Sequence, residues 1–458
     1  MTTHIRGTGE PGLMSVAATI PSSCLHDIFR AADRKERLGG EVVKLHVGEP
    51  YFGPPEEVAE ALAAAVRQGR TAYSEVEGLL ELREAVVEKL ATANGVDSDP
   101  SRVVITPGSC QGLSALLHTL AEPGAEILLP ELHWPVHLQQ ALLAGFRPVF
   151  YPLDAGFRPD PEGIRAKAGP RTRVLLVNSP ANPTGAVLDA GQLTELLELA
   201  REHGWGIISD EAYEHYVYDG GHVSFASLER DVPVAERIVH STFSFSKSLA
   251  MTGYRLGYVA AADDRTAHAL RVVQEASIIG PSTPVQYAGI AALRLAGATD
   301  AHRELVRRNR DTALAPLVAA GLLSELPAGG WYAMADISRT GLDAEEFTAR
   351  LLASRSVAVV AGTGFATQPR LDEAGRIRST AFAPWSRHLV RIAFCVAPEA
   401  LRTGVRRLVE FVESGEYGKP EEYGEAAGDG GFSGAGAGAP SGAERSAGAR
   451  AGGGRAVG

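Results

Sequence analysis

The order of the apolar runs along the chain is the feature that most restricts its fold. Between residues 103 and 241, short continuous runs rich in Val, Ile and Leu alternate with amphipathic stretches. Such runs predict strands that are buried on both faces, separated by helices, and therefore a largely parallel sheet. Ligands bind at the carboxyl ends of such strands. The predicted strands are 103–106, 126–130, 147–153, 174–178, 206–210 and 237–241, and the predicted helices are 109–120, 136–143 and 189–202.

The pattern changes after about residue 303. Residues 305–319 and 345–353 have the spacing of helices, and three apolar segments near them read as strands: GGWYAMADI, VAVVAG and LVRIAFCV. Strands and helices in this mixture indicate a smaller α+β domain. From Ser414 onward the chain is rich in Gly, Ala and Ser, and it cannot bury enough apolar surface to offset the entropy of ordering, which predicts disorder.

These observations predict an α/β protein with a large domain, built on a mostly parallel sheet flanked by helices, and a smaller α+β domain. The expected divisions are a flexible N-terminus (1–14), a segment that packs on the small domain (15–52), the large domain (53–300), the small domain (301–413) and a disordered tail (414–458).

Composition excludes several classes of partner. The formal net charge of -11 opposes binding to nucleic acid or to an anionic membrane surface. Three cysteines do not make a disulfide framework, which favours a reducing compartment. The N-terminus has no apolar run of the kind that an export signal needs, and no stretch approaches the ~18 apolar residues of a membrane helix. We therefore expect a cytoplasmic protein with neither a membrane nor a nucleic acid as its partner.

The segment SFSKSLAMTGYRLGY carries the strongest chemical signal. Lys247 follows an apolar strand within a Ser-rich turn, and Arg255 comes eight residues later. A lysine at the mouth of a sheet can be partly desolvated, which lowers the pKa of its amine and lets it attack an aldehyde. Arg255, Ser244 and Ser246 could bind a phosphate through charge-assisted hydrogen bonds. Taken alone, a surface lysine beside a loop explains the segment equally well.

Three further motifs follow predicted strands. SDEAY places Asp210 at a strand end and Tyr213 just beyond it, although such a carboxylate is often only a helix cap. NSPANPTG turns through Asn182 and by itself reads as an ordinary turn. TPGSCQG opens a helix, and its free N–H groups make either an anion site or a plain helix start.

The order of these motifs is specific: a phosphate-type turn, an aromatic residue, NPTG, DEAY, and then SFSK with its arginine. From about Pro21 to Val412 the chain resembles the class I/II aminotransferases of pyridoxal-phosphate fold type I, the aspartate aminotransferase-like superfamily. The resemblance implies a homodimeric enzyme that uses pyridoxal 5′-phosphate. Such an enzyme moves an amino group from an L-amino acid to a 2-oxo acid by a ping-pong mechanism, and it needs no metal.

The resemblance also implies a role for each residue that contacts the cofactor ring. Lys247 matches the lysine that holds the cofactor as a Schiff base and acts as general acid and base. Asp210 matches the carboxylate paired with the pyridine nitrogen, which keeps the ring an electron sink. Asn182 and Tyr213 match the pair bonded to the ring 3′ oxygen, and Trp134 matches the aromatic residue stacked on the ring, although a core Trp is the alternative.

Ser109, Cys110, Ser244 and Arg255 match the residues that bind the cofactor phosphate. Tyr73, in AYSEVEG, matches a tyrosine that reaches the phosphate of the neighbouring subunit, and without the resemblance it would be a packing residue.

Three residues match substrate contacts. Arg391, in LVRIAFC, matches the arginine that grips the substrate α-carboxylate; an arginine among apolar neighbours needs a partner. Gly48 matches a backbone contact to the same carboxylate, and the resemblance also implies that Asn182 contacts the substrate. One departure is informative: several dicarboxylate-specific relatives have Lys where this chain has Cys110, which weakens an aspartate or prephenate assignment. We interpret Cys110 and Cys395 as packing residues.

Three alternatives differ in chemistry. A β-lyase, a decarboxylase or an oxidative biosynthetic enzyme of the same fold type would share Lys247, Asp210 and Arg391. An aminotransferase-like ligand sensor fused to a DNA-binding module would need an additional basic domain before the VGEP segment. A nicotinamide enzyme would need its glycine motif after a strand, and the GxGxxG match at residues 7–12 has no strand before it.

Overall fold

The structure is a computed structural model that describes residues 15–20, 24–295, 297–415 and 417. The predicted flexible N-terminus, residues 1–14, lies outside these residues. So does the predicted tail, apart from residues 414, 415 and 417.

A seven-stranded sheet forms the centre of the large domain. Its spatial order is β2-β8-β7-β6-β5-β3-β4, and only β8 runs antiparallel to its neighbours. The predicted largely parallel sheet is confirmed, and β8, which the sequence did not predict, is its one reversed strand. The bounds are β2 (Val103–Thr106), β3 (Glu126–Pro130), β4 (Arg147–Tyr151), β5 (Thr172–Asn178), β6 (Gly206–Asp210), β7 (Val239–Ser244) and β8 (Gly257–Ala260).

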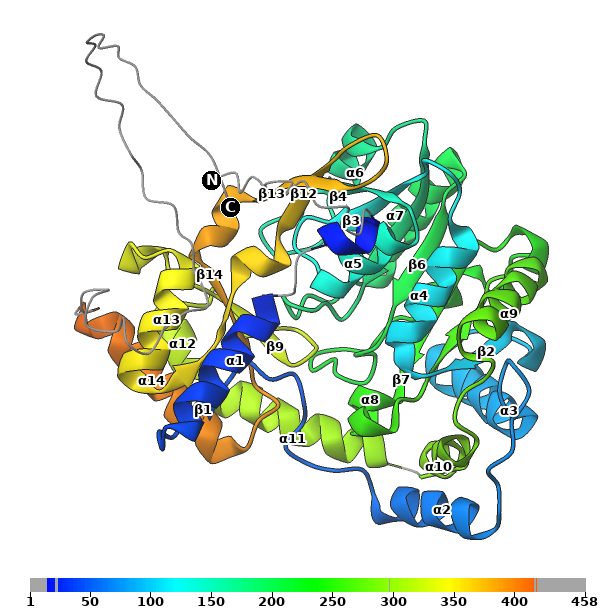
Figure 1. The fold of residues 1–458 in the computed structure, drawn as a ribbon, viewed down its shortest axis with the longest axis horizontal. Helices are drawn as coiled ribbons and strands as arrows, with labels where there is room; N and C mark the ends of the chain where they lie inside the picture. The colour runs from blue at the N-terminus through cyan, green and yellow to red at the C-terminus, as the bar shows by residue number, and fades with distance from the viewer. Residues whose placement is uncertain (1–14, 21–23, 296, 416, 418–458) are drawn as a thin grey trace, which may run out of the picture.

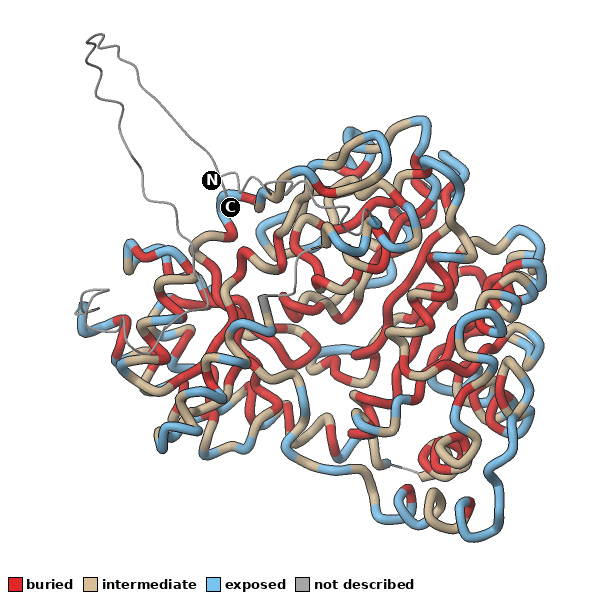
Figure 2. The backbone as a smooth tube through the Cα atoms, viewed as in Figure 1, coloured by how far each residue is buried: buried red, intermediate tan, exposed pale blue. Residues whose placement is uncertain are grey.

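Helices cover both faces of this sheet. Alternate strand residues point to opposite faces, so Val104 packs with Leu113 of α4 on one face, whereas Val103 packs with Leu82 of α3 on the other. Buried residues accordingly follow the strands, and exposed ones lie on the outer helices (Figure 2). The helices are α2 (Glu56–Arg67), α3 (Leu80–Lys89), α4 (Gly108–Leu120), α5 (Pro135–Leu143), α6 (Pro161–Lys167), α7 (Ala190–His203), α9 (Asp264–Ile278) and α10 (Thr283–Leu293).

Local sequence sets the ends of α7. Asp189 accepts a hydrogen bond from the Gln192 N–H while the Gln192 side chain accepts one from the Asp189 N–H, which is a capping box. Gly204 ends the helix in the left-handed conformation, at φ 70°. The predicted helix, residues 189–202, is therefore confirmed to within one residue at each end.

The small domain is built on an antiparallel three-stranded sheet in the order β11-β14-β9. The single helix predicted for residues 305–319 is wrong, because α11 ends at Ala313 and a separate α12 follows. Pro316 has no N–H to donate and its ring clashes with the preceding turn, so the helix cannot continue through it. The elements are α11 (Ala298–Ala313), α12 (Ala315–Ala319), β9 (Tyr332–Asp336), α13 (Ala344–Arg355), β11 (Val360–Ala361), β14 (Leu389–Ala393) and α14 (Pro398–Ser414).

The segment before the large domain contacts the small domain. The strand β1 (Val43–Lys44) pairs in parallel with β10 (Val357–Ala358). Lys35 of α1 (Cys24–Arg37) donates its Nζ to the carbonyl oxygens of Leu352 and Ala353 near the end of α13. These contacts support the proposal that residues 15–52 belong with the small domain, and the boundaries at 52, 300 and 413 stay proposed.

A hairpin that the sequence did not predict reaches from the small domain onto the large one (Figure 1). It consists of β12 (Thr367–Leu371) and β13 (Ile377–Phe382). Ile377 is 4% exposed and belongs to the same buried cluster as Leu113 of α4 and Leu138 of α5. Arg147 at the start of β4 donates to the Asp372 carbonyl at 3.2 Å. The hairpin thus completes part of the large domain's core.

No helix in the described ranges combines the length and the apolar character that crossing a bilayer requires.

Candidate active site

The predicted site residues follow strands that end at one edge of the large sheet. β3, β5, β6 and β7 are mutually parallel, and β2 runs the same way because both β2 and β7 are antiparallel to β8. Their carboxyl ends therefore meet at one edge, as expected for a ligand site. The residues that follow these ends are Ser109, Trp134, Asn182, Tyr213 and Lys247.

Lys247 lies in a single helical turn, α8 (Phe245–Ser248), directly after β7. Ser244 caps this turn by accepting a hydrogen bond from the Ser246 N–H. The Lys247 Nζ donates to the Gly48 carbonyl at 3.0 Å and lies 5.0 Å from the centre of the Trp331 ring. The structure therefore brings the predicted lysine and Gly48 together, in partly buried and largely aromatic surroundings.

Asp210 ends β6 and is 4% exposed. Its Oδ2 accepts a hydrogen bond from His137 Nε2 at 2.8 Å, and its Oδ1 accepts one from the Ala212 N–H at 3.2 Å. The Trp134 ring meets the His137 ring edge to face, with 5.2 Å between the ring centres. Because a buried carboxylate needs partners, His137 is part of what holds Asp210 at the end of β6.

Arg391 of β14 is 2% exposed and has no anionic partner in the described part of the chain. Its Nη1 donates to Asn182 Oδ1 at 3.0 Å and its Nη2 to the His46 carbonyl at 3.1 Å, while its Nε is buried without a partner. The guanidinium carbon lies 4.1 Å from the Tyr332 ring centre and 4.6 Å from that of Phe365. A buried cation is costly without an anion, so this arrangement fits a ligand carboxylate.

A second anion position lies where α4 begins. Gly108 has φ +77°, and a Cβ there would lie 2.7 Å from Arg255 Nη2. A Cβ on Gly257 would lie 2.5 Å from the Ser109 nitrogen. Glycine at both positions therefore lets Arg255 approach the first turn of α4, whose N–H groups have no partner within the helix. Arg255 also donates to Ser246 Oγ at 3.4 Å, and together these groups fit a phosphate.

Tyr213 is buried between the two domains. Its hydroxyl donates to the Tyr332 hydroxyl at 3.3 Å. Burial, followed by the neighbouring Tyr332, raises the pKa of Tyr213 well above its ordinary value, so the phenol keeps its proton and can donate it. A Cβ on Gly48 would lie 1.8 Å from the Tyr332 hydroxyl oxygen, so only glycine fits there.

Cys110 lies in the first turn of α4, where Gln140 Nε2 donates to its carbonyl at 2.7 Å and lies 3.3 Å from its sulfur. Burial raises the pKa of the Cys110 thiol, and burial also raises that of Cys395 to about 12. Both thiols therefore stay protonated near neutral pH, which agrees with packing roles.

Tyr73 is the predicted site residue that this chain does not bring to the others. It lies between α2 and α3 and is 85% exposed. Within the described ranges, no hydrogen bond or ring contact joins Tyr73 to Lys247 or Arg255.

Sequence reasoning missed His137, Tyr332 and Phe365. His137 could have been found, because it lies in the first turn of the helix that begins directly after Trp134. Tyr332 and Phe365 lie on small-domain segments whose approach to Arg391 depends on tertiary packing alone.

The part of the chain that contains the predicted site residues is similar to known proteins. The sequence matches the family model for aminotransferase class I and II over residues 40–408. It is 38% identical to the aspartate/prephenate aminotransferase of Thermus thermophilus, over 77% of this chain and 90% of that protein. It is 36% identical to aromatic-amino-acid aminotransferase 2 of Thermococcus litoralis, over 74% and 87% of the two chains. The fold is similar to Thermus thermophilus aspartate aminotransferase with maleate, with a TM-score of 0.78, 33% identity and coverage of 88% and 100%.

Proposed function

This chain belongs to the aminotransferase class I and II family and is an aminotransferase, and from that premise we propose that it holds pyridoxal 5′-phosphate at Lys247. It transfers an amino group from an L-amino acid to a 2-oxo acid. The roles of individual residues given below belong to the proposal.

One observation carries the proposal. Lys247, Arg255 and Arg391 are three cations at the proposed site, and none of them forms an ion pair with a carboxylate of the described chain. The site therefore needs two anions from outside the protein. A cofactor phosphate at Arg255 and the first turn of α4, and an amino-acid carboxylate at Arg391, would supply them.

Bound in this site, pyridoxal phosphate supplies a protonated pyridine ring that draws electrons away from the reacting amino-acid carbon. Asp210 keeps the proton on the ring nitrogen, since each of its oxygens can accept more than one hydrogen bond. His137 fixes the orientation of that carboxylate. Tyr213 donates its phenolic hydrogen to the ring oxygen, and Trp134 packs on the ring face.

Lys247 moves the proton in each half of the reaction. Its Nζ takes the proton from the amino-acid α-carbon as a general base and returns it as a general acid. Arg391 holds the substrate α-carboxylate, and Asn182 holds Arg391 through its Oδ1. Since the first oxo acid leaves before the second binds, the kinetics are ping-pong.

The absorption spectrum of the purified protein tests the proposal. We expect a visible band from the cofactor at Lys247 that an amino donor removes and a 2-oxo acid restores. The panel of donors should contain dicarboxylic, aromatic and small neutral amino acids, because Cys110 places no positive charge in the first turn of α4. A protein with no band after addition of pyridoxal phosphate contradicts the proposal.

Another reaction at the same site is not favoured. A β-lyase, a decarboxylase or an oxidative biosynthetic enzyme would share the same lysine, aspartate and arginine, but the curated relatives named above are aminotransferases. Release of ammonia or carbon dioxide with the donor panel would identify such a reaction.

We expect His137→Phe to lower kcat roughly 10- to 100-fold, because a hydrogen bond to a charged group contributes about 1.5–3 kcal/mol. Phenylalanine preserves the ring contact with Trp134 but removes the donor to Asp210. His133→Phe is the matched control, since His133 is equally buried and its ring nitrogen lies 3.0 Å from the Pro130 carbonyl oxygen. Steady-state kinetics of both variants test this expectation. A wild-type kcat in His137→Phe would contradict the role of His137 in orienting Asp210.

We also propose that two chains share each site through Tyr73. Tyr73 is 85% exposed and Ile279 is 53% exposed, and Gly280, next to Ile279, lies against the backbone of Ser74 and Glu75. Large exposed apolar side chains in neighbouring segments are typical of an interface. A C2 homodimer would cover them.

Hybrid dimers test the shared site. Lys247→Ala and Tyr73→Ala subunits are each expected to be poorly active alone. In a hybrid of the two, one of the two sites regains both native residues, so co-refolding is expected to raise activity above either parent. A fully active monomer in light scattering, or a mixture no more active than its parents, contradicts the proposal.

A cytoplasmic location stays a prediction.

A further inference from the structure

Lys89 and Glu214 form a buried ion pair that, among the described residues, shares no hydrogen bond with Arg255 or Arg391. The Lys89 Nζ lies 2.6 and 2.5 Å from the two carboxylate oxygens of Glu214, and the two side chains are 13% and 7% exposed. Burying two charges is costly, and apolar residues often stabilise a protein as well or better. The position of this pair therefore calls for a reason other than stability.

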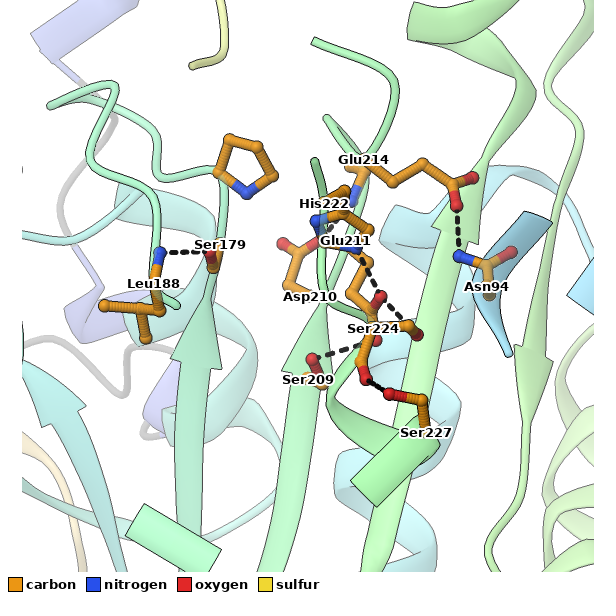
Figure 3. A network of polar contacts seen from close by, with 12 residues as sticks. Asn94, Ser179, Leu188, Ser209, Asp210, Glu211, Glu214, His222, Ser224 and Ser227 are labelled. Atoms are coloured by element: carbon orange, nitrogen blue, oxygen red, sulfur yellow. Dashed lines mark hydrogen bonds and ion pairs between the residues drawn. The ribbon is translucent and has the colours of Figure 1, made fainter. Parts of the chain in front are cut away.

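The helix that carries Lys89 changes from an α-helix to a π-helical turn next to Glu214. α3 ends at Lys89 and continues as a π-helical turn, Leu90–Asn94, that Gly95 closes at φ 67°. Asn94, five residues after Lys89, donates its Nδ2 to Glu214 Oε2 at 2.7 Å (Figure 3). A π-helix has i→i+5 hydrogen bonding, which brings residues five apart closer to one face, and such turns are frequent at functional sites.

Lys89 is also fixed by the strands beside it. Its Nζ lies 4.6 Å from the centre of the Phe243 ring and 3.2 Å from the Tyr258 hydroxyl. Phe243 belongs to β7, the strand that leads directly into the turn of Lys247. The Lys89–Glu214 ion pair therefore packs against β7, the strand that positions Lys247.

The segment around Glu214 meets the Lys247 turn at two points. His215 Nδ1 lies 3.5 Å from Glu214 and 2.8 Å from the Ser248 hydroxyl. Tyr216 donates its hydroxyl to the Lys247 carbonyl at 3.0 Å. Burial lowers the pKa of His215 to about 4, so it is neutral near neutral pH and acts here through its hydrogen bond.

Glu214 stays ionised throughout the working pH range. Burial alone would raise its pKa, but Lys89, His215, His222 and the Asn94 hydrogen bond together hold the pKa of Glu214 at about 2. A second buried carboxylate, Glu211, accepts hydrogen bonds from Ser209, Ser224 and His222 (Figure 3). Both carboxylates anchor the segment that carries Asp210 and Tyr213.

We propose that Glu214, bound by Lys89 and Asn94, is a positioning residue that fixes where Tyr213 and Asp210 lie relative to the turn of Lys247. It contacts neither substrate nor cofactor. The inference rests on the proposed function of that site. Its physical basis is that small errors in the placement of reacting groups cost large factors in rate.

The double variant Lys89→Met/Glu214→Gln tests the positioning role without leaving one buried charge unpaired. Glutamine keeps an acceptor for Asn94, and removing both charges together is often neutral for stability. We expect a folded protein that binds the cofactor but whose kcat is roughly 10- to 100-fold lower, with KM changed little. The visible circular dichroism of the bound cofactor is expected to change, since it reports the cofactor's surroundings independently of turnover.

Glu229→Gln is the matched control for loss of a buried carboxylate. Glu229 is 1% exposed and accepts hydrogen bonds from Arg201 and from the Val239 N–H, at the opposite end of β7. It is expected to lower the thermal midpoint of the unloaded protein while kcat and circular dichroism stay wild type. An equal loss of kcat in this control would show general destabilisation and would overturn the proposal.

A milder variant keeps the test decisive if the double variant does not fold. Asn94→Leu removes only the 2.7 Å hydrogen bond, and it should change kcat and circular dichroism in the same direction by a smaller factor. Wild-type values in either variant, alongside a wild-type enzyme that binds cofactor and transaminates, overturn the positioning role alone. A wild-type protein that binds no cofactor overturns the proposed function as well.

Discussion

Replacing Lys247 with alanine is expected to lower kcat by at least about 10⁴-fold, because one side chain supplies both the attachment of the cofactor and the proton transfer. Arg255, the first turn of α4 and Asp210 remain, so the variant should still bind pyridoxal phosphate without a covalent bond. Single-turnover kinetics with an amino donor, together with an absorption titration of the cofactor, measure the two effects separately.

Lys44→Ala is the control for loss of a lysine. Lys44 is a partly exposed residue of β1 paired with Glu36 at 2.7 Å, and its removal should leave kcat unchanged. A Lys247→Ala protein that keeps activity within about tenfold of wild type, less than one general acid–base group typically contributes, would contradict the role given to Lys247.

Replacing Arg391 with methionine is expected to lower kcat/KM by roughly 10²- to 10³-fold, since loss of one partner of a buried charged pair costs about 2–5 kcal/mol. Arg391→Lys should recover only part of this loss, because a lysine cannot make the bidentate pair. The unfolding temperature of Arg391→Met, unlike its kcat/KM, is not expected to fall. In the unloaded protein Arg391 is a buried cation without an anionic partner, so Arg391→Met is expected to unfold at or above the wild-type temperature.

Arg387→Met is the matched control in the same domain, because Arg387 has a 43% exposed side chain that lies over the Phe382 ring. It should change neither kcat/KM nor the unfolding temperature by much. The role of Arg391 would be refuted by an Arg391→Met enzyme with a wild-type KM for the amino donor.

The sequence predicted the parts of the fold that have a strong local pattern. Residues 174–177 form a continuous apolar run, and they are buried in the sheet as expected. β8 was not predicted because Gly257–Ala260 begins within the segment SFSKSLAMTGYRLGY, which was interpreted for its lysine and arginine. The β12–β13 hairpin was not predicted because its residues are partly buried or exposed, apart from Ile377, and therefore show no regular apolar spacing.

The same distinction holds for the site. Asp210, Asn182 and Lys247 could be located because each lies at or just beyond the end of a strand of the parallel part of the sheet, so their convergence follows from topology. Their roles remain proposals. Tyr332 and the His46 carbonyl could not be located, because nothing local marks them and only the packing of the small domain brings them to Arg391.

The β12–β13 hairpin also imposes an order on how the chain folds during synthesis. Ile377 packs with Leu113 and Leu138, which leave the ribosome long before it does. Until the hairpin emerges, the apolar surface that Ile377 covers faces water, and contacts between such distant residues form slowly. The large domain can therefore complete this part of its core only after the β12–β13 hairpin of the small domain has been synthesised.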